Sequence, residues 1–164
     1  MRSKLHWKRG VFSNTSEIYS EEKPIGSLKE NSFKQSAEGE INGKRYRFHT
    51  KGVFKPETQI TDADSNTVMG RIEYNSWMTK ATIRVSPKSF QWKYENIWNT
   101  RWSLTSSEGR QMKFQGNSSK GSIEMDGEDD LLVLTGLFIT NYYRQMAIVI
   151  LVAVLVPIFA SVSN

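Results

Sequence analysis

The chain has 164 residues, 24% of them charged and 38% hydrophobic, with a formal net charge of +5. This length allows one domain with a sizeable core. The modest basic excess favours anionic partners such as lipid headgroups or nucleic acid, although a soluble surface with scattered charge has the same composition. The absence of cysteine excludes disulfides, thiolate zinc sites and cysteine nucleophiles. No apolar segment follows the basic N-terminus, so we expect no cleavable secretory signal and a cytoplasmic protein.

Residues 4–126 alternate between hydrophobic and polar side chains, which is typical of strands with one buried and one solvated face. In one such segment Tyr46 and Phe48 lie on the face opposite Arg47. Further alternating segments occupy residues 68–74, 81–86, 90–95, 101–105, 111–114 and 122–125. Short strands at regular spacing predict a mainly β fold, an antiparallel meander that forms a sandwich or a barrel.

Turn-forming residues separate the alternating segments. Asn42 and Gly43 stand between two of them and predict a two-residue hairpin. The large aromatic side chains of the region are interpreted as core residues and cross-strand pairs rather than as a stacking platform for bases or sugars. They include Trp77, Trp92, Trp98 and Trp102.

The composition changes near the C-terminus. Residues 126–130 form an acidic turn, and residues 131–140 are apolar on both faces, which predicts a fully buried strand. Residues 141–145 are a polar break, and residues 142–157 are predicted to form a hydrophobic helix that ends or kinks near Pro157. The β-branched residues of this segment also suit a strand, but so long an apolar strand would be prone to aggregation.

Residues 146–160 contain no polar side chain, so apolar material must surround them on every side. That material is either the core of the domain or a bilayer. The side chains that would make these contacts are Met146, Ile148, Ile150, Leu151, Val154, Leu155 and Phe159. A bilayer requires about 20 apolar residues, which a span of about 142–162 supplies, with Tyr142, Tyr143 and Arg144 as interface anchors.

The order of these elements resembles the tubby C-terminal-like superfamily, which includes tubby domains, phospholipid scramblases and plant LURP-one-related proteins. The similarity lies in polar hairpins such as residues 60–72, where a turn precedes a Val-x-Gly-x-Ile strand, and in the apolar C-terminal segments. The resemblance implies one domain over residues 1–164, a meander that closes into a barrel around a C-terminal hydrophobic helix. A barrel of about a dozen strands is too wide for its own side chains to fill, and such a helix would fill it.

Two acidic segments are weak candidates for a calcium site. The spacing Asp62-x-Asp64-x-Asn66 is that of a calcium loop, but Thr67 replaces the required glycine, so a hairpin turn is the preferred interpretation. The second segment is the acidic turn, which is more typical of a solvated loop. Scramblase-like proteins are associated with calcium, so the resemblance adds some support for this turn. Its residues are Asp126, Glu128, Asp129 and Asp130.

No feature of the sequence indicates catalysis. There is no nucleophile elbow, phosphate loop or dinucleotide fingerprint. His6 and His49 do not have the spacing of metal ligands. We therefore expect neither an enzyme nor a bound cofactor.

The strongest candidate binding site is a basic cluster on one predicted strand and just after it. Its residues are Lys44, Arg45, Arg47, Lys51 and Lys55. These cations would lie within a Debye length of one another and could contact anionic lipid, but a solvated strand face is the alternative. Tubby domains bind phosphoinositides through basic residues, so the resemblance implies a lipid site of this kind. Nucleic-acid binding is not expected, because the aromatic residues lie on the opposite face.

The sequence supports two functional hypotheses. One is a non-catalytic, cytoplasmic, tubby-like barrel that touches anionic membrane lipid through the basic cluster. The other is a β-domain held as an integral membrane protein by a C-terminal transmembrane helix. No feature of the sequence predicts an oligomeric state.

Overall fold

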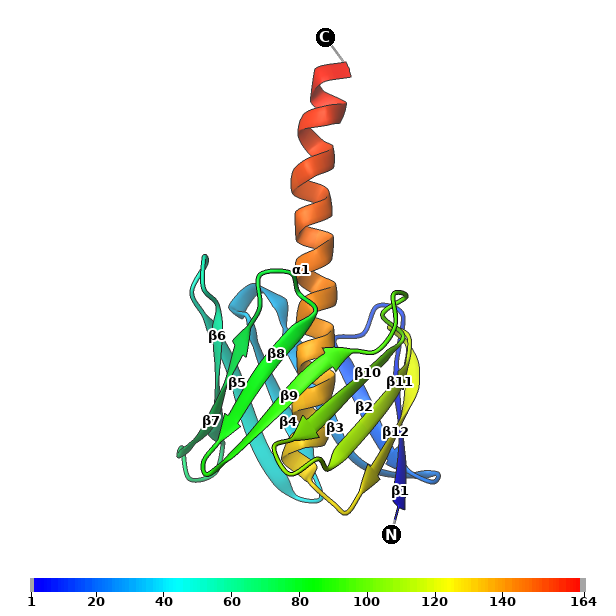
Figure 1. The fold of residues 1–164 in the computed structure, drawn as a ribbon. Helices are drawn as coiled ribbons and strands as arrows, with labels where there is room; N and C mark the ends of the chain where they lie inside the picture. The colour runs from blue at the N-terminus through cyan, green and yellow to red at the C-terminus, as the bar shows by residue number, and fades with distance from the viewer. Residues whose placement is uncertain (1, 163–164) are drawn as a thin grey trace.

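The chain forms a closed barrel of twelve antiparallel strands with one C-terminal helix that enters its interior (Figure 1). This computed structural model describes residues 2–162. The first residue and the last two of the predicted domain 1–164 lie outside the described residues. The predicted fold class, a mainly β meander that closes into a barrel around a C-terminal hydrophobic helix, is confirmed.

Each strand pairs with its neighbours in sequence, and β1 pairs with β12 to close the barrel. The strands are β1 (Arg2–Arg9), β2 (Thr15–Ser20), β3 (Lys23–Asn31), β4 (Ser36–Ile41), β5 (Lys44–Lys51), β6 (Glu57–Asp62), β7 (Val68–Tyr74), β8 (Lys80–Val85), β9 (Lys88–Tyr94), β10 (Arg101–Ser106), β11 (Gln111–Gly116) and β12 (Lys120–Asp126). A short 3-10 helix, η1 (Ser32–Lys34), lies between β3 and β4.

The alternation of hydrophobic and polar residues sets which face of each strand lines the interior. In β5, Tyr46 and Phe48 are buried while Arg45 and Arg47 face solvent. The predicted hairpin between β4 and β5 is confirmed. Its residue Asn42 has a φ of 51° and Gly43 a φ of 78°, as a tight two-residue turn requires.

The helix α1 (Asp130–Val162) begins earlier than predicted and is continuous. Residues 131–140 are helical, so the prediction of a buried strand there is wrong. Every residue of this segment is buried, because the barrel wall surrounds it on all sides. A segment buried all round shows neither a helical nor a strand period, so its sequence did not distinguish the two. The helix also continues past Pro157, beyond the predicted end at residue 157.

Small residues let the helix approach the wall. A Cβ atom on Gly136 would lie 2.3 Å from Cζ of Phe114, and one on Gly39 would lie 2.8 Å from Cδ1 of Leu134. Aromatic side chains occupy the remaining space. The ring of Phe138 stacks on that of Phe48 with centroids 4.8 Å apart.

The tryptophans divide between the core and the turns. Trp92 and Trp102 are buried, as predicted. Trp77 and Trp98 are 84% and 78% exposed, so their assignment to the core is wrong. Both belong to turns between strands, where the alternation that places a side chain inward no longer applies.

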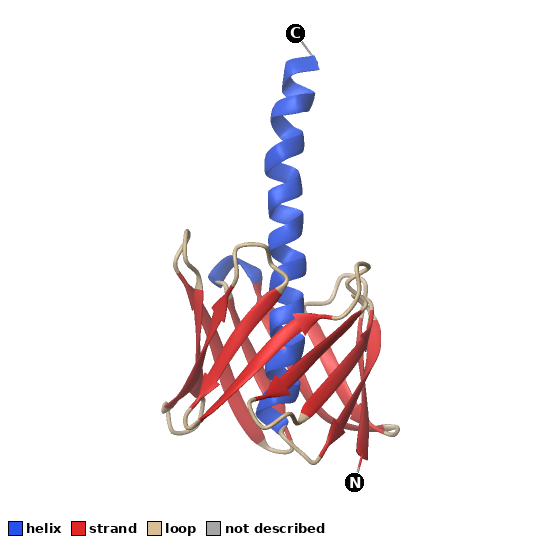
Figure 2. Ribbon diagram, viewed as in Figure 1, coloured by secondary structure: helices blue, strands red, loops and turns tan. Residues whose placement is uncertain are grey.

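The connections between strands lie at the two ends of the barrel. We call the end where α1 leaves the barrel the exit rim. It comprises the β1–β2, β3–β4, β5–β6, β7–β8, β9–β10 and β11–β12 connections. The opposite end, where α1 begins, is the far rim (Figure 2). The meander alternates direction, so successive turns belong to the two rims in alternation.

Candidate membrane-contact site

The acidic turn at the far rim fixes the start of α1. The carboxylate of Asp129 accepts a hydrogen bond of 3.1 Å from the backbone N–H of Leu132, which caps the helix. Asp130 accepts a hydrogen bond of 2.9 Å from the side chain of Asn42 and lies 3.6 Å from Nζ of Lys44. These contacts tie the helix to the β4–β5 hairpin, and they give two of the four calcium candidates a structural role.

Asp126 and Asp62 also have protein contacts. Asp126 lies 3.6 Å from Arg2, and Glu128 belongs to the turn before α1. Asp62 accepts hydrogen bonds from the backbone N–H groups of Asp64 and Ser65, and these hold the pKa of its carboxyl below its ordinary value. Within residues 2–162, no group of three or more acidic or histidine side chains is arranged to hold a metal ion.

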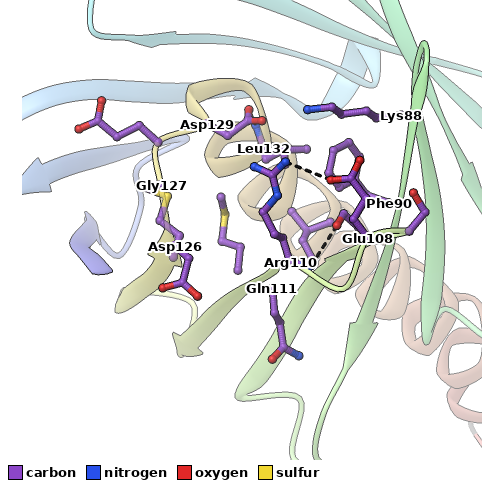
Figure 3. Close-up of a pocket in the computed structure, with 15 residues that line it drawn as sticks. Lys88, Phe90, Glu108, Arg110, Gln111, Asp126, Gly127, Asp129 and Leu132 are labelled. Atoms are coloured by element: carbon purple, nitrogen blue, oxygen red, sulfur yellow. Dashed lines mark hydrogen bonds and ion pairs between the residues drawn. The ribbon is translucent and has the colours of Figure 1, made fainter. Parts of the chain in front are cut away.

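A pocket with a volume of about 100 Å³ opens at the far rim (Figure 3). Phe90 and Leu132 supply its apolar lining, and Arg110 donates a hydrogen bond of 3.1 Å to Glu108 at its edge. Asp129 also lines the pocket, and its carboxylate is engaged in capping α1. Two of the charged groups around this pocket, Arg110 and Glu108, thus pair with each other, and Lys88 also lines it.

Polar residues of α1 bond to the barrel where the helix leaves it, and we call Asn141, Tyr143 and Arg144 the collar. Asn141 donates a hydrogen bond of 3.1 Å to the buried carboxylate of Glu30 at the end of β3. Arg9 at the end of β1 donates to the same carboxylate. Burial raises the pKa of Glu30, although Arg9 and Asn141 act in the opposite direction.

The other two collar residues bond to different turns of the exit rim. The hydroxyl of Tyr143 donates to the carbonyl of Lys80 and lies 3.3 Å from the side-chain oxygen of Asn75. Arg144 donates a hydrogen bond of 3.1 Å to the carbonyl of Asn117, and its guanidinium lies over the ring of Trp102 at 5.3 Å. The polar break in the sequence is therefore a set of contacts that fixes the helix in the barrel mouth.

The environment of α1 changes within one turn of the collar. Residues 131–140 are buried, whereas residues 147–162 are exposed and, apart from Ser161, still apolar, and they project from the barrel (Figure 1). The helix is long and apolar enough to span a membrane, and its most hydrophobic 18-residue window contains no buried residue.

Because residues 147–162 are exposed, the interpretation of residues 142–157 as the helix that fills the barrel is wrong. Met146 still packs against the barrel mouth, but the other predicted contact residues of the helix are exposed rather than part of the core. They are Ile148, Ile150, Leu151, Val154, Leu155 and Phe159. The helix segment that fills the barrel is residues 130–143, which precede the most hydrophobic stretch.

The structure divides the basic cluster between the two ends of the barrel. Lys44 lies at the far rim, and Arg45 bonds to Asp64 through Nε at 2.9 Å. Arg47 lies 3.6 Å from Glu38 on the neighbouring strand. Lys51 and Lys55, by contrast, lie at the end of β5 and in the turn after it, on the exit rim. Lipid binding by the whole cluster stays a prediction, and only its last two members lie where the apolar helix emerges.

A second pocket, of about 280 Å³, lies beside the helix at the exit rim. Ser32 and Gln35 line one side of it, and Tyr142, Met146 and Val149 line the other. The collar and this pocket were not predicted from the sequence. Asn141 and Arg144 stood out as polar residues in an apolar segment, but nothing indicated that their partners are Glu30 and the carbonyl of a distant turn.

Comparisons with models of protein families, with curated proteins and with solved structures gave no match for this chain. The resemblance to the tubby C-terminal-like superfamily therefore stays a prediction.

Proposed function

We propose that this chain is a non-catalytic, membrane-anchored β-barrel protein that associates with anionic lipid. In this proposal residues 147–162 of α1 cross the hydrocarbon layer, and residues 130–143 of the same helix hold the barrel to it. A tubby-like relationship is part of the proposal, and the central helix inside the barrel is the feature that supports it.

The observation that carries the proposal is the change of environment along one continuous helix. Monomeric soluble proteins rarely expose contiguous apolar patches larger than a few hundred Å². Residues 147–162 are exposed throughout. Apart from Ser161, they are also apolar around the whole circumference of the helix. A bilayer would remove this surface from water, and the backbone polar groups of a helix are already bonded internally.

The distribution of basic residues supports a cytoplasmic barrel. Cytoplasmic flanks of transmembrane helices are enriched in lysine and arginine. Arg144 lies three residues before the exposed segment, and Lys51 and Lys55 lie on the exit rim around it. The same cations would attract the anionic lipids of the cytoplasmic leaflet.

The test is whether the full chain behaves as an integral membrane protein. We expect it to sediment with membranes and to resist extraction at alkaline pH. Replacing Val152 with Arg in the middle of the exposed segment costs about 2.5–3.5 kcal/mol on insertion scales and should release a large fraction of the protein.

Val152→Leu is the matched control, because it keeps the segment apolar, and it should remain bound. Complete extraction of the parent protein by alkaline carbonate would contradict the proposal that the chain is anchored in the membrane. Membrane binding of Val152→Arg equal to that of the parent would do the same.

A further inference from the structure

The exit rim carries most of the large hydrophobic side chains that the described part of the barrel exposes to solvent. Every turn of this rim except the β11–β12 turn presents at least one of them at its tip. They are Val11, Phe12, Phe33, Val53, Phe54, Trp77, Ile97 and Trp98. Outside α1, the other exposed large hydrophobic side chains among residues 2–162 are Val68 and Met69 at the start of β7.

The far rim has a different composition. Its turns carry carboxylates, at Glu21, Glu22, Asp64, Glu108, Glu128 and Asp129. Several basic residues at that end are paired with carboxylates there, including Arg2, Lys44 and Arg110. The concentration of exposed apolar side chains is therefore specific to the end from which the apolar helix projects.

Basic side chains interleave with the apolar tips. Lys34 follows Phe33 and Lys55 follows Phe54 in their turns. Further cations lie at the ends of the strands that reach this rim, at Arg9, Lys51, Lys80, Arg101 and Lys120. Of the acidic residues nearby, Glu30 is buried against Arg9, Glu57 lies 3.8 Å from Arg71, and Glu95 lies 3.6 Å from Lys93. Aromatic residues beside lysine and arginine suit the interface of an anionic bilayer.

The length of the projecting segment agrees with this geometry. Residues 147–162 span about 24 Å at about 1.5 Å per residue, and the hydrocarbon core of a bilayer is about 30 Å thick. A segment of this length leaves no room for the barrel to stand away from the membrane. The turn tips around the helix must then lie at the level of the lipid headgroups or below them.

We propose that the exit rim is a membrane-docking ring, whose apolar turn tips insert into the interfacial layer of an anionic bilayer around α1. This inference rests on the membrane anchoring proposed above, and it adds a second contact that fixes the orientation of the barrel. The occupant of the apolar rim is lipid rather than a protein partner, because the turns of this rim surround the point where the apolar helix leaves the barrel (Figure 1).

The natural absence of cysteine allows single labels to report on each part of the molecule. Phe54→Cys and Trp98→Cys place an environment-sensitive fluorophore on the exit rim. Ser107→Cys places it on the far rim, and Val152→Cys places it in the projecting helix. Each full-length variant is reconstituted into nanodiscs of phosphatidylcholine and phosphatidylserine, with and without lipids that carry a nitroxide near the headgroup end of the acyl chain.

The labels at Phe54 and Trp98 should show blue-shifted emission and be quenched several-fold more than the label at Ser107. If only the label at Val152 is quenched, the result supports membrane anchoring by α1 and contradicts the proposal that the exit rim docks on the membrane. If no label is quenched above the Ser107 level, both proposals fail. A blue shift at the rim without quenching by lipid nitroxides would mean that protein covers the rim, and it would overturn the docking ring.

Discussion

Gly136 faces the ring of Phe114 so closely that a Cβ atom at this position would overlap with it. Glycine in a helix costs about 1 kcal/mol relative to alanine, so its presence here needs a packing reason. The position of Phe114 supplies one, because that ring is itself stacked on Trp102 with centroids 5.5 Å apart and cannot easily move.

We therefore expect Gly136→Ala to lower the free energy of unfolding, by about 1–3 kcal/mol as for other overpacked cores, although alanine is the better helix former. Chemical denaturation of the reconstituted protein would measure the change. Phe114→Leu should relieve the clash, so Gly136→Ala should cost less in that background. A stabilising effect of Gly136→Ala in the parent would contradict the packing described here.

Glu30 gives the stability of the protein a pH dependence. Because burial raises its pKa in the folded state, the folded protein binds the proton more tightly than the unfolded chain does. Its contribution to stability is therefore fully present below the ordinary pKa of a glutamate and is lost as the pH rises through the raised pKa. Glu30→Gln cannot ionise and should remove this dependence.

Thermal unfolding of parent and Glu30→Gln protein across the weakly acidic range would test this prediction. The melting temperature of the parent relative to the variant should fall as the pH rises. Glu38→Gln, on the outer face of β4, serves as the control for an exposed carboxylate. A parent that gains stability relative to Glu30→Gln with rising pH would show that Arg9 and Asn141 outweigh burial.

At the scale of the element, α1 combines two environments that the sequence presented as alternatives, the interior of the barrel and the space outside it. Residues 130–143 complete the core of the barrel, and residues 147–162 lie outside it. The collar between them bonds to three separate parts of the exit rim. One helix is thus both the filling of the barrel and the candidate anchor.

Two truncations separate these roles. A chain cut after Gln145 keeps the buried segment and the collar, so we expect it to be soluble and to melt cooperatively. A chain cut after Asp129 loses the buried segment and should be insoluble or molten, since each buried apolar side chain contributes about 1.5–3 kcal/mol. Near-UV dichroism and thermal melting would distinguish the two. A helix that filled the barrel with residues 142–157 would predict unfolding in both cases, and that outcome would contradict the structure.

At the scale of the whole molecule, the alternation of side chains was enough to predict an antiparallel meander, whereas its closure into a barrel around a helix was implied by the resemblance to a known superfamily. Strands such as β5, β9 and β12 follow the alternation closely, because one face of each is buried and the other is exposed. The sequence could not place Trp77 or Trp98, because a residue in a turn is outside the alternation. Nor could it distinguish strand from helix at residues 131–140, since burial on all sides erases the period of either.

The site was less predictable than the fold. The sequence identified the apolar segment and its two possible environments, the barrel core and a bilayer. It did not identify the residue at which the helix leaves the barrel. That boundary depends on Glu30, Asn117 and Lys80, which are distant from α1 in sequence and meet it only in the folded barrel. The exit rim depends on the up-and-down order of the strands, which brings turns from the whole length of the chain to one end.

The closure of the barrel also sets an order of events during synthesis. β1 is made first, yet its partner β12 and the helix that fills the interior follow all the other strands. Trp7 in β1 cannot pair with Gly121 in β12 until β12 has been synthesised. The inward-facing side chains of the strands also remain exposed until residues 130–143 have left the ribosome and can fill the barrel. Such long-range pairing makes folding slow. The segment that completes the barrel is followed directly by the one that projects from it, so the exposed apolar segment is synthesised just after the barrel first becomes able to fold.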